Sequence, residues 1–262
     1  MQYTLQHIAD ALGFEAVINL DDEPVNFLLT DSRRISFPAS SLFFALQTER
    51  RDAHIFIKEL YERGVKNFVV KKDFDISSYT HANFLFTENT LDALQRLAAY
   101  HRSQFNYPVI AITGSNGKTV VKEWLYQLLS PDYNIVRSPR SYNSQTGVAL
   151  SLWQMNETDN LAIFEAGISQ AGEMEKLEKM IQPTIGLFTN IGEAHNDGFK
   201  NLEEKIKEKL QLFKNANFLI CNSDDTLILN ELQHFKGEIL NWSIQNKASL
   251  TITSVKKSEA ST

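Results

Sequence analysis

The segment that most constrains the fold is VIAITGSNGKT at residues 109–119, where a short apolar run stops at a glycine-rich loop. An apolar run, a glycine loop and an amphipathic stretch at 120–129 predict a buried strand, a turn and a helix. Gly114 and Gly117 let the loop bend so that backbone N–H groups point inward. The loop then ends at a helix N-terminus, where the helix dipole favours an anion. The segment therefore predicts a phosphate-binding loop.

The side chains of this loop fit a nucleotide and its metal ion. Lys118 would reach the terminal phosphates, and the hydroxyl of Thr119 would bind Mg²⁺. The usual phosphate loop has another glycine five residues before Gly117, where this chain has Ile112, so the loop is the shorter GxxGKT form. A plain turn with a surface lysine is the alternative, which the strand-loop-helix context disfavours. The expected cofactor-binding residues are Gly114, Ser115, Asn116, Gly117, Lys118 and Thr119.

The remaining chain alternates short apolar runs with helical patterns. Three of the runs show little polar alternation, which is typical of strands covered on both faces in a parallel sheet; they lie at 160–167, 183–190 and 216–222. We expect an α/β fold in which a small N-terminal α/β domain precedes a doubly wound, mostly parallel central domain. Because a predicted helix at 89–105 leads directly into the phosphate-loop strand, we place the domains at 1–86 and 87–262.

Charge and cysteine content exclude several classes of function. The net charge of −6 argues against a protein that binds a nucleic-acid backbone. The single cysteine, Cys221, allows no internal disulfide, so a reducing cytoplasm is the expected location. No apolar run approaches the roughly 18 residues of a membrane span. We therefore expect a cytoplasmic protein with no membrane insertion.

Glu165 and His195 are candidate metal ligands because of where they follow predicted strands. Glu165 ends the apolar run LAIFE, and His195 comes shortly after the run at 183–190. Carboxyl ends of strands in open α/β sheets face the ligand crevice, at the same edge as the phosphate loop. A carboxylate at this edge suits Mg²⁺, whereas a lone histidine is more often a solvated loop residue.

Helical periodicity predicts which side chains of two helices face inward. At about 100° per residue, Leu202, Ile206, Lys209 and Phe213 fall on one stripe, while Lys207 lies on the polar side. A lysine that faces inward is costly unless it is neutralised, paired or modified, although a lysine at the edge of the stripe could also reach water. In the helix after the phosphate loop, the residues expected to face inward are Val121, Trp124, Leu125 and Leu128.

Several further segments resemble the Mur ligases, the enzymes that add amino acids to the peptidoglycan precursor. TGSNGKT resembles their ATP loop, FEAGIS with GEM their acidic Mg²⁺ segment, and SYNSQTGVALSL the segment that contacts substrate. TNIGEAHNDGF followed by EEKIKEKLQLF resembles the segment with the metal-site histidine and the modified lysine. TDSRRI with SLFFAL resembles the N-terminal uridine-nucleotide domain. The resemblance covers nearly the whole chain.

The resemblance implies a role for each matching residue. Lys118, Glu165, His195 and Lys209 would be catalytic, with Thr119, Glu165, His195 and a carbamate on Lys209 holding Mg²⁺. The carbamate forms from CO₂ and a neutral amine, which burial of a lysine supplies. One departure from the family is Gln211, where a glutamate is common. The substrate-binding residues implied by the match are Asp31, Ser32, Arg33, Ser141 and Asn143, with the guanidinium of Arg33 suited to a diphosphate.

Within the family the match is closest to the MurF type, which joins D-Ala-D-Ala to UDP-MurNAc-tripeptide with ATP through an acyl phosphate. The alternatives are a MurE-type ligase adding a diamino acid, or a non-catalytic nucleotide-binding fragment. Family members carry a third, C-terminal ligase domain that this chain does not reach, so we expect these 262 residues alone to turn over little. The glycine-poor N-terminal part resembles a branch in which the ligase is fused to an alanine racemase.

Overall fold

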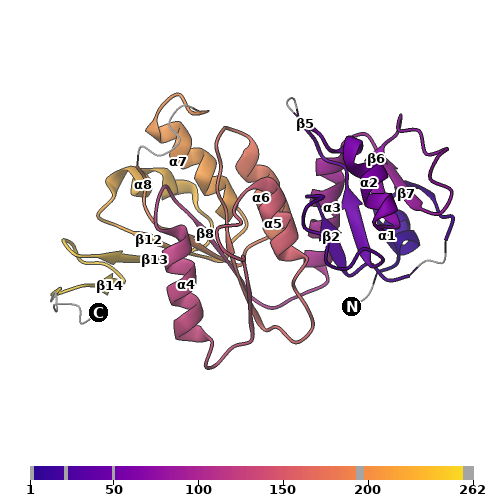
Figure 1. Cartoon of the computed structure of the whole chain (residues 1–262). Helices are drawn as coiled ribbons and strands as arrows, with labels where there is room; N and C mark the ends of the chain where they lie inside the picture. Colours follow the sequence, from indigo (N-terminus) through magenta and orange to yellow (C-terminus); the bar gives the residue numbers. More distant parts are fainter. Residues whose placement is uncertain (1–2, 21–22, 49–50, 193–197, 256–262) are drawn as a thin grey trace. The chain divides into compact units, whose positions relative to one another are not determined.

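The computed structural model describes residues 3–20, 23–48, 51–192 and 198–255. The chain forms two compact units, residues 1–101 and 102–262, each with its own sheet (Figure 1). This arrangement confirms the predicted α/β class with parallel sheets. Among the described residues, no helix combines the length and the apolar character needed to cross a bilayer.

The first unit is a five-stranded sheet whose strands pair in parallel except for the antiparallel pairing of β1 with β7. The rings of Phe43, Phe68 and Phe84 form its centre, with the Phe68 and Phe84 ring centroids 5.4 Å apart. In sheet order the strands are β1 (Glu15–Val17), β7 (Asn83–Thr87), β6 (Asn67–Lys71), β3 (Ser41–Phe44) and β2 (Phe27–Leu29). The other elements are α1 (Leu5–Leu12), the β4–β5 ribbon (Gln47–Thr48 and Arg51–Asp52), the 3₁₀ turn η1 (Ala53–Phe56), α2 (Ile57–Glu62) and α3 (Thr90–Ser103).

The helix α3 belongs mainly to the first unit, which moves the division between units from the expected 86/87 to 101/102. Its first residue, Thr90, donates a hydrogen bond from Oγ1 to the carbonyl of Ala45 at 2.9 Å. Near its end, His101 Nδ1 lies 3.0 Å from the hydroxyl of Tyr3. The chain order suggested that α3 goes with the following strand, but these contacts with distant segments decide where it packs.

The second unit is a seven-stranded sheet in which all described strand pairs are parallel. In sheet order the strands are β14 (Leu250–Thr251), β13 (Glu238–Ser243), β12 (Phe218–Asn222), β11 (Ile185–Phe188), β8 (Val109–Thr113), β10 (Leu161–Glu165) and β9 (Ile135–Arg137). Every residue of β8 and β10 is buried, so both faces of the central strands are covered. The helices and turns are α4 (Lys118–Leu129), α5 (Gln145–Leu152), α6 (Glu173–Ile181), α7 (Leu202–Leu210), η3 (Gln211–Phe213), α8 (Thr226–Glu231) and η4 (Leu232–His234).

The strand register brings three loops to one edge of this sheet. Strand β8 lies between β10 and β11, with Ile112 opposite Glu165 on one side and Thr113 opposite Phe188 on the other. Because all three strands run in the same direction, the segments that follow them leave from the same edge. The glycine loop after β8, the carboxylate that ends β10 and the segment after β11 are therefore neighbours.

The helix α4 is rotated from the orientation that its apolar pattern predicted. Val121, Leu125 and Leu129 pack against Ile110 and Ile163 of the sheet. Trp124 and Leu128 were expected to face inward, and this was wrong, since they are 63 % and 72 % exposed. The helix has two neighbouring apolar stripes, one with Leu125 and Leu129 and one with Trp124 and Leu128. Periodicity alone does not show which of the two stripes faces the sheet. The buried side chain of Lys122 shares the inward face and marks the true orientation.

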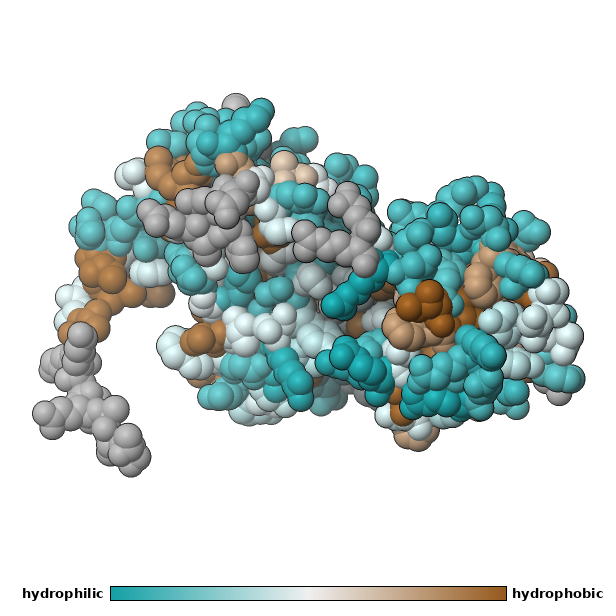
Figure 2. Space-filling view, turned by 45° about the horizontal axis from the view of Figure 1, so that its top comes forward, coloured by the Kyte–Doolittle hydropathy of each residue, from teal (hydrophilic) through white to brown (hydrophobic). Residues whose placement is uncertain are grey.

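Exposed apolar side chains also occur at the far end of the second unit. Leu240, Ile244 and Leu250 are exposed on or beside the last two strands of the sheet. Figure 2 shows hydrophobic surface gathered at this end of the unit. Single exposed apolar side chains are common on protein surfaces and support no functional inference by themselves.

The orientation of α4 predicts different costs for two neighbouring substitutions. Leu125→Ala removes a side chain packed against the sheet and should lower the free energy of unfolding by about 2 kcal/mol. Trp124→Ala should change it by less than about 0.5 kcal/mol, because the ring is largely exposed. Urea unfolding of the two variants measures both values, and equal destabilisation would contradict this orientation.

Candidate functional site

The loop between β8 and α4 has the backbone that an anion site requires. Gly114 has φ 143° and Gly117 has φ 79°, both in regions that favour glycine. Gly117 caps α4 without a side-chain hydrogen bond to the first turn. The N–H groups at the start of α4 therefore have no side-chain acceptor at the cap position, and they form the positive end of the helix dipole.

The segment after β11 braces this loop. Ser115 donates its backbone N–H to the carbonyl of Asn190 at 2.9 Å, and Asn116 donates to Asn190 Oδ1 at 3.1 Å. Thr189 Oγ1 donates to the carbonyl of Asn116 at 2.7 Å, and Gly192 N–H donates to Ser115 Oγ at 2.9 Å. The N–H groups of Ser115 and Asn116 thus serve to hold the loop, which leaves the first turn of α4 as the anion-facing part.

Three buried or half-buried lysines converge on this loop. Lys118 and Lys209 both donate to the carbonyl of Gly114, at 2.9 and 3.3 Å, and Lys205 donates to the carbonyl of Gly192 at 2.6 Å. Burial lowers the pKa of Lys118 and of Lys205 from the usual value. Burial, with the nearby charges of Lys118 and Lys205, lowers the pKa of Lys209 to about 7. The hydrogen bonds described for these ammonium groups go to neutral carbonyls, and a bound phosphate chain would add negative charge beside them.

The carboxylate of Glu165 lies beside the first turn of α4. Its Oε2 accepts a hydrogen bond from Thr119 Oγ1 at 2.9 Å, and its Oε1 lies 2.9 Å from Lys122 Nζ. The carboxylate is fully buried, and Oε1 has no hydrogen-bond donor of good geometry within the part of the chain that the structure describes. A hydroxyl and a carboxylate oxygen at this place are hard oxygen donors of the kind that Mg²⁺ takes. Thr119 and Glu165 therefore fit the predicted metal site.

A pocket of about 270 Å³ opens beside these lysines. It brings Lys118 and Lys209 together with Asn143, whose side chain packs against Gly167. Polar side chains around α5 and α6 form much of the remaining wall, among them Ser144, Gln145, Thr146, Ser169 and Glu173. Ser141 is exposed and is not part of the wall. The pocket thus joins the phosphate loop to the segment predicted to contact substrate.

Comparison with known families identifies this unit. Residues 112–262, more than half of the chain, match the family described as "Mur ligase middle domain". The chain belongs to the Mur ligase family. The match begins inside β8 and includes the glycine loop, Glu165 and the helix that carries Lys205 and Lys209.

Individual Mur ligases extend the similarity to the first unit. The UDP-N-acetylmuramoyl-tripeptide–D-alanyl-D-alanine ligase of Borreliella burgdorferi is 35 % identical over 76 % of this chain and 45 % of its own length. A crystal structure of MurF from Acinetobacter baumannii has a TM-score of 0.84 and 26 % identity, over 92 % of this chain and 53 % of that one. MurF ligase from Thermotoga maritima in complex with ADP shares the fold, with a TM-score of 0.75 and 24 % identity over 85 % and 51 %. The chain spans about half the length of these Mur ligases.

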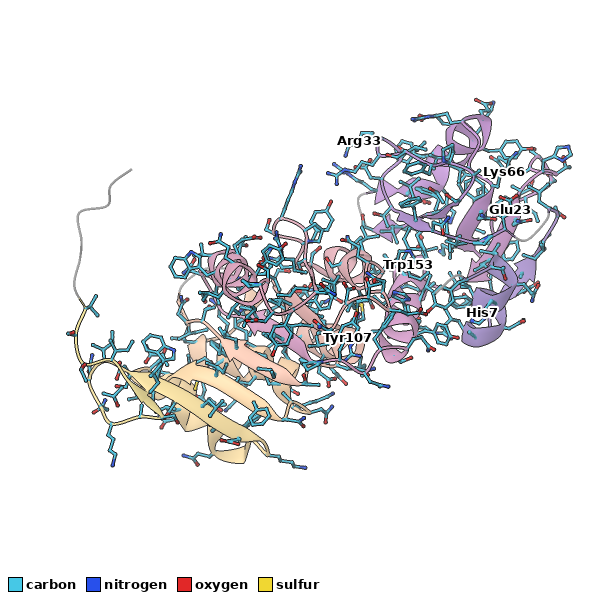
Figure 3. The ribbon with its side chains drawn as sticks, turned by 90° about the horizontal axis from the view of Figure 1, so that it is seen from below. His7, Glu23, Arg33, Lys66, Tyr107 and Trp153 are labelled. Carbon is cyan, nitrogen blue, oxygen red and sulfur yellow. The ribbon has the colours of Figure 1, made fainter. Side chains whose placement is uncertain are left out.

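In the first unit of this Mur ligase, Asp31 and Arg33 are adjacent and paired. Arg33 donates from Nε and Nη2 to the two carboxylate oxygens of Asp31, each at 2.8 Å. This pairing lowers the pKa of Asp31 to about 2. The Arg33 side chain is 84 % exposed and lies at the surface of the unit (Figure 3), whereas Ser32 is buried. Arg33 is thus accessible to a ligand, whereas Ser32 is largely enclosed.

The structure also contains two buried lysines that the sequence reasoning missed. Lys122 lies one turn after Lys118, and Lys205 lies one turn before Lys209, so each has a helical neighbour that was singled out. At about 100° per residue, Lys205 falls about 40° from Lys209, close enough to share its inward face. Helical periodicity alone therefore indicated that Lys205 faces inward.

His195, a predicted metal ligand, lies outside the described residues.

The glycine loop predicts a large difference between two glycine-to-alanine substitutions. A Cβ on residue 114 would lie 1.9 Å from Thr189 Oγ1 and 3.0 Å from the Asn190 backbone, whereas residue 117 has open space. Gly114→Ala should destabilise the second unit by about 3 kcal/mol, through both strain and overlap. Gly117→Ala should cost about 1–2 kcal/mol for its left-handed backbone alone. Denaturant unfolding compares them, and a Gly114→Ala cost no larger than that of Gly117→Ala would contradict this contact.

The lowered pKa of Lys209 predicts a pH-dependent effect of Lys209→Met on stability. With a folded pKa of about 7 and an ordinary pKa of 10.5 in the unfolded chain, the buried amine penalises folding fully below pH 7. The penalty shrinks as pH rises from 7 and vanishes above 10.5, because the amine is then neutral in both states. Lys209→Met should therefore stabilise the chain most at pH 6, and progressively less towards pH 10.

This comparison requires buffers depleted of CO₂, and Lys207→Met is the matched control. Lys207 is on the same helix and exposed, and it pairs with Glu203. Lys207→Met should show no stabilisation at pH 6 that decreases between pH 7 and 10. A Lys209→Met effect that does not vary with pH would show that the amine keeps an ordinary pKa.

Proposed function

We propose that this chain forms the precursor-binding and ATP-binding parts of a ligase that joins D-Ala-D-Ala to UDP-MurNAc-tripeptide. The observation that carries the proposal is the convergence of Lys118 and Lys209 on the carbonyl of Gly114, beside the Thr119–Glu165 contact and at the pocket that includes Asn143. Relatives that carry the name of this activity support the choice of substrates.

The proposed reaction concentrates negative charge in two steps. The terminal carboxylate of the tripeptide attacks the γ-phosphorus of ATP, the bond to ADP breaks, and an acyl phosphate forms. The amine of D-Ala-D-Ala then attacks the acyl carbon, and phosphate leaves as the peptide bond forms. Preorganised cations and helix N–H groups are the main catalytic means for such transfers. We expect Lys118 and the first turn of α4 to supply them.

Thr119 and Glu165 would hold Mg²⁺, which when bound shields the charge of the phosphate oxygens. Thr119 Oγ1 and Glu165 Oε2 are 2.9 Å apart, so both oxygens would contact the same cation. His195 stays a proposed ligand on the strength of its sequence context. Arg33 is proposed to bind the diphosphate of the uridine nucleotide, since its guanidinium is exposed.

Lys209 is proposed to form a carbamate. Its neutral amine, available because of the pKa near 7, would attack CO₂ to give a carbamate anion and one proton. The change replaces a buried ammonium by an anion next to Lys118 and Lys205, whose charges then stabilise it. The resulting carboxylate oxygens would add a hard donor set close to the Gly114 carbonyl.

The proposal is tested in two stages, binding and turnover. Isothermal titration of the 262-residue chain should show ATP binding that Lys118→Met weakens by about tenfold or more, because the ammonium at the phosphates is lost. Phosphate release by the whole polypeptide containing this chain should then require ATP, UDP-MurNAc-tripeptide and D-Ala-D-Ala. Turnover only with UDP-MurNAc-dipeptide and a diamino acid would assign a MurE-type activity instead. Absence of ATP binding would refute a nucleotide site.

A further inference from the structure

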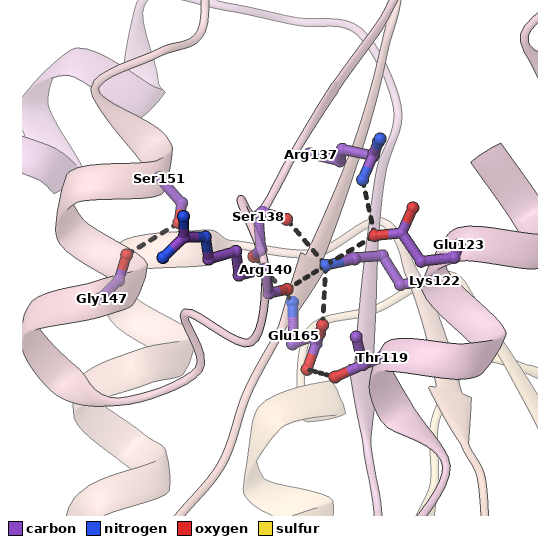
Figure 4. Close-up of polar contacts among 9 residues, drawn as sticks. All are labelled: Thr119, Lys122, Glu123, Arg137, Ser138, Arg140, Gly147, Ser151 and Glu165. Atoms are coloured by element: carbon purple, nitrogen blue, oxygen red, sulfur yellow. Dashed lines mark hydrogen bonds and ion pairs between the residues drawn. The ribbon is translucent and has the colours of Figure 1, made fainter.

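Lys122 is completely buried in α4 and lies at the centre of a polar network (Figure 4). Its ammonium donates to the carbonyl of Ser138 at 2.8 Å and to the carbonyl of Arg140, and it lies 2.9 Å from Glu165 Oε1. Glu123 Oε1, which pairs with Arg137 at 2.6 Å, lies 3.2 Å away. A single side chain thus contacts the helix, the loop after β9 and the end of β10.

Burying a lysine–glutamate pair in a protein core has a high free-energy cost. Removing two charges from water costs several kcal/mol per ion, and well-packed apolar residues of similar volume are often as stabilising. Lys122 and Glu165 are both fully buried. Folding alone therefore does not account for the pair, and its geometry indicates what else it does.

At Glu165 the network fixes the direction of the carboxylate. Thr119 holds Oε2, and the charge of Lys122 holds Oε1, while the backbone N–H of Glu165 donates to Ser138 Oγ at 3.2 Å. The carboxylate is therefore restrained from both sides next to the phosphate loop. Mutation of groups that hold a metal ligand in this way typically lowers metal affinity or activity by roughly 10–100-fold.

At the loop after β9 the same ammonium holds a strained residue. Arg140 is not glycine but has φ 52°, a conformation that costs about 1–2 kcal/mol for such a residue. Its carbonyl is one of the two that Lys122 binds. Three residues later, Asn143 lines the pocket, and its carbonyl accepts a hydrogen bond from Gly167 N–H at 2.8 Å. The strained turn thus leads directly into the segment that reaches the site.

We propose that Lys122 is a positioning residue: its ammonium sets the orientation of the Glu165 carboxylate and the course of residues 138–143 together. One buried cation would thereby couple the metal ligand to the substrate-contacting segment. The metal half of this inference rests on the proposed function, because it needs Glu165 to hold the Mg²⁺ of bound ATP.

The test compares ATP binding with and without Mg²⁺ in the 262-residue chain and its variants. The wild-type chain should bind ATP more tightly when Mg²⁺ is present. In Lys122→Met, metal-free ATP binding should stay within about twofold, because the phosphate loop and Lys118 are intact, whereas the gain from Mg²⁺ should fall by about tenfold or more. A purely structural role would leave that gain unchanged in the folded protein. Lys122→Arg, which keeps the charge, should recover part of the gain.

Lys179→Met is the matched control, since Lys179 is exposed on α6 and pairs with Glu175. It should change neither titration. If Lys122→Met does not give a cooperative thermal transition, Lys122→Gln, which keeps an N–H donor for the two carbonyls, is judged by the same criterion. A Mg²⁺ gain of wild-type size in the folded Lys122 variant overturns the proposal. A wild-type chain that binds no ATP overturns the proposed function, and the metal half of this inference with it.

Hydrogen exchange tests the loop half of the proposal. In Lys122→Met the amides of residues 138 and 140–143 should exchange faster than in the wild-type chain and in Lys179→Met, while those of the phosphate loop should keep their rates. Unchanged exchange in 138–143 would show that Lys122 does not hold this segment.

Discussion

The close contact between Gly114 and Thr189 is the constraint on which the site depends. It lets the loop after β8 lie directly on the segment after β11, where Ser115, Asn116 and Asn190 exchange hydrogen bonds. A side chain at position 114 would separate the two segments. Without that contact the carbonyl of Gly114 would not be presented to both Lys118 and Lys209. The geometry of the lysine cluster therefore follows from the absence of one Cβ.

The electrostatics of the site follow from this packing. Lys118, Lys205 and Lys209 are drawn together around two backbone carbonyls, and a carbonyl dipole only partly offsets an ammonium charge. The nearby carboxylate of Glu165 is already paired with Lys122. Among the described residues, these lysines lie beside the start of α4, so that the same region favours an anion through their ammonium groups and through its backbone.

Local patterns predicted the elements of the second unit well but not the rotation of α4 or the position of α3. The strand at 109–113, the glycine loop and the inward face of Lys209 each depend on contiguous residues or on one helical stripe, which sequence shows directly. The orientation of α4 depends on a polar contact between Lys122 and Glu165, which come from different elements. Lys122 was missed because a lysine is usually solvated, and two of its partners are backbone carbonyls that carry no sequence signal. The roles of the site residues remain predictions.

The parallel order of the second sheet has a consequence for how the chain is made. Thr113 and Thr189 meet through a hydrogen bond although they are 76 positions apart in the sequence, and β8 must wait for β11 to be synthesised before it gains that neighbour. Long-range parallel pairing of this kind forms slowly, because a long loop has to close first. During translation the glycine loop consequently lacks its contacts with the segment after β11 until that segment has left the ribosome. In this interval the exposed apolar strand β8 is open to premature association.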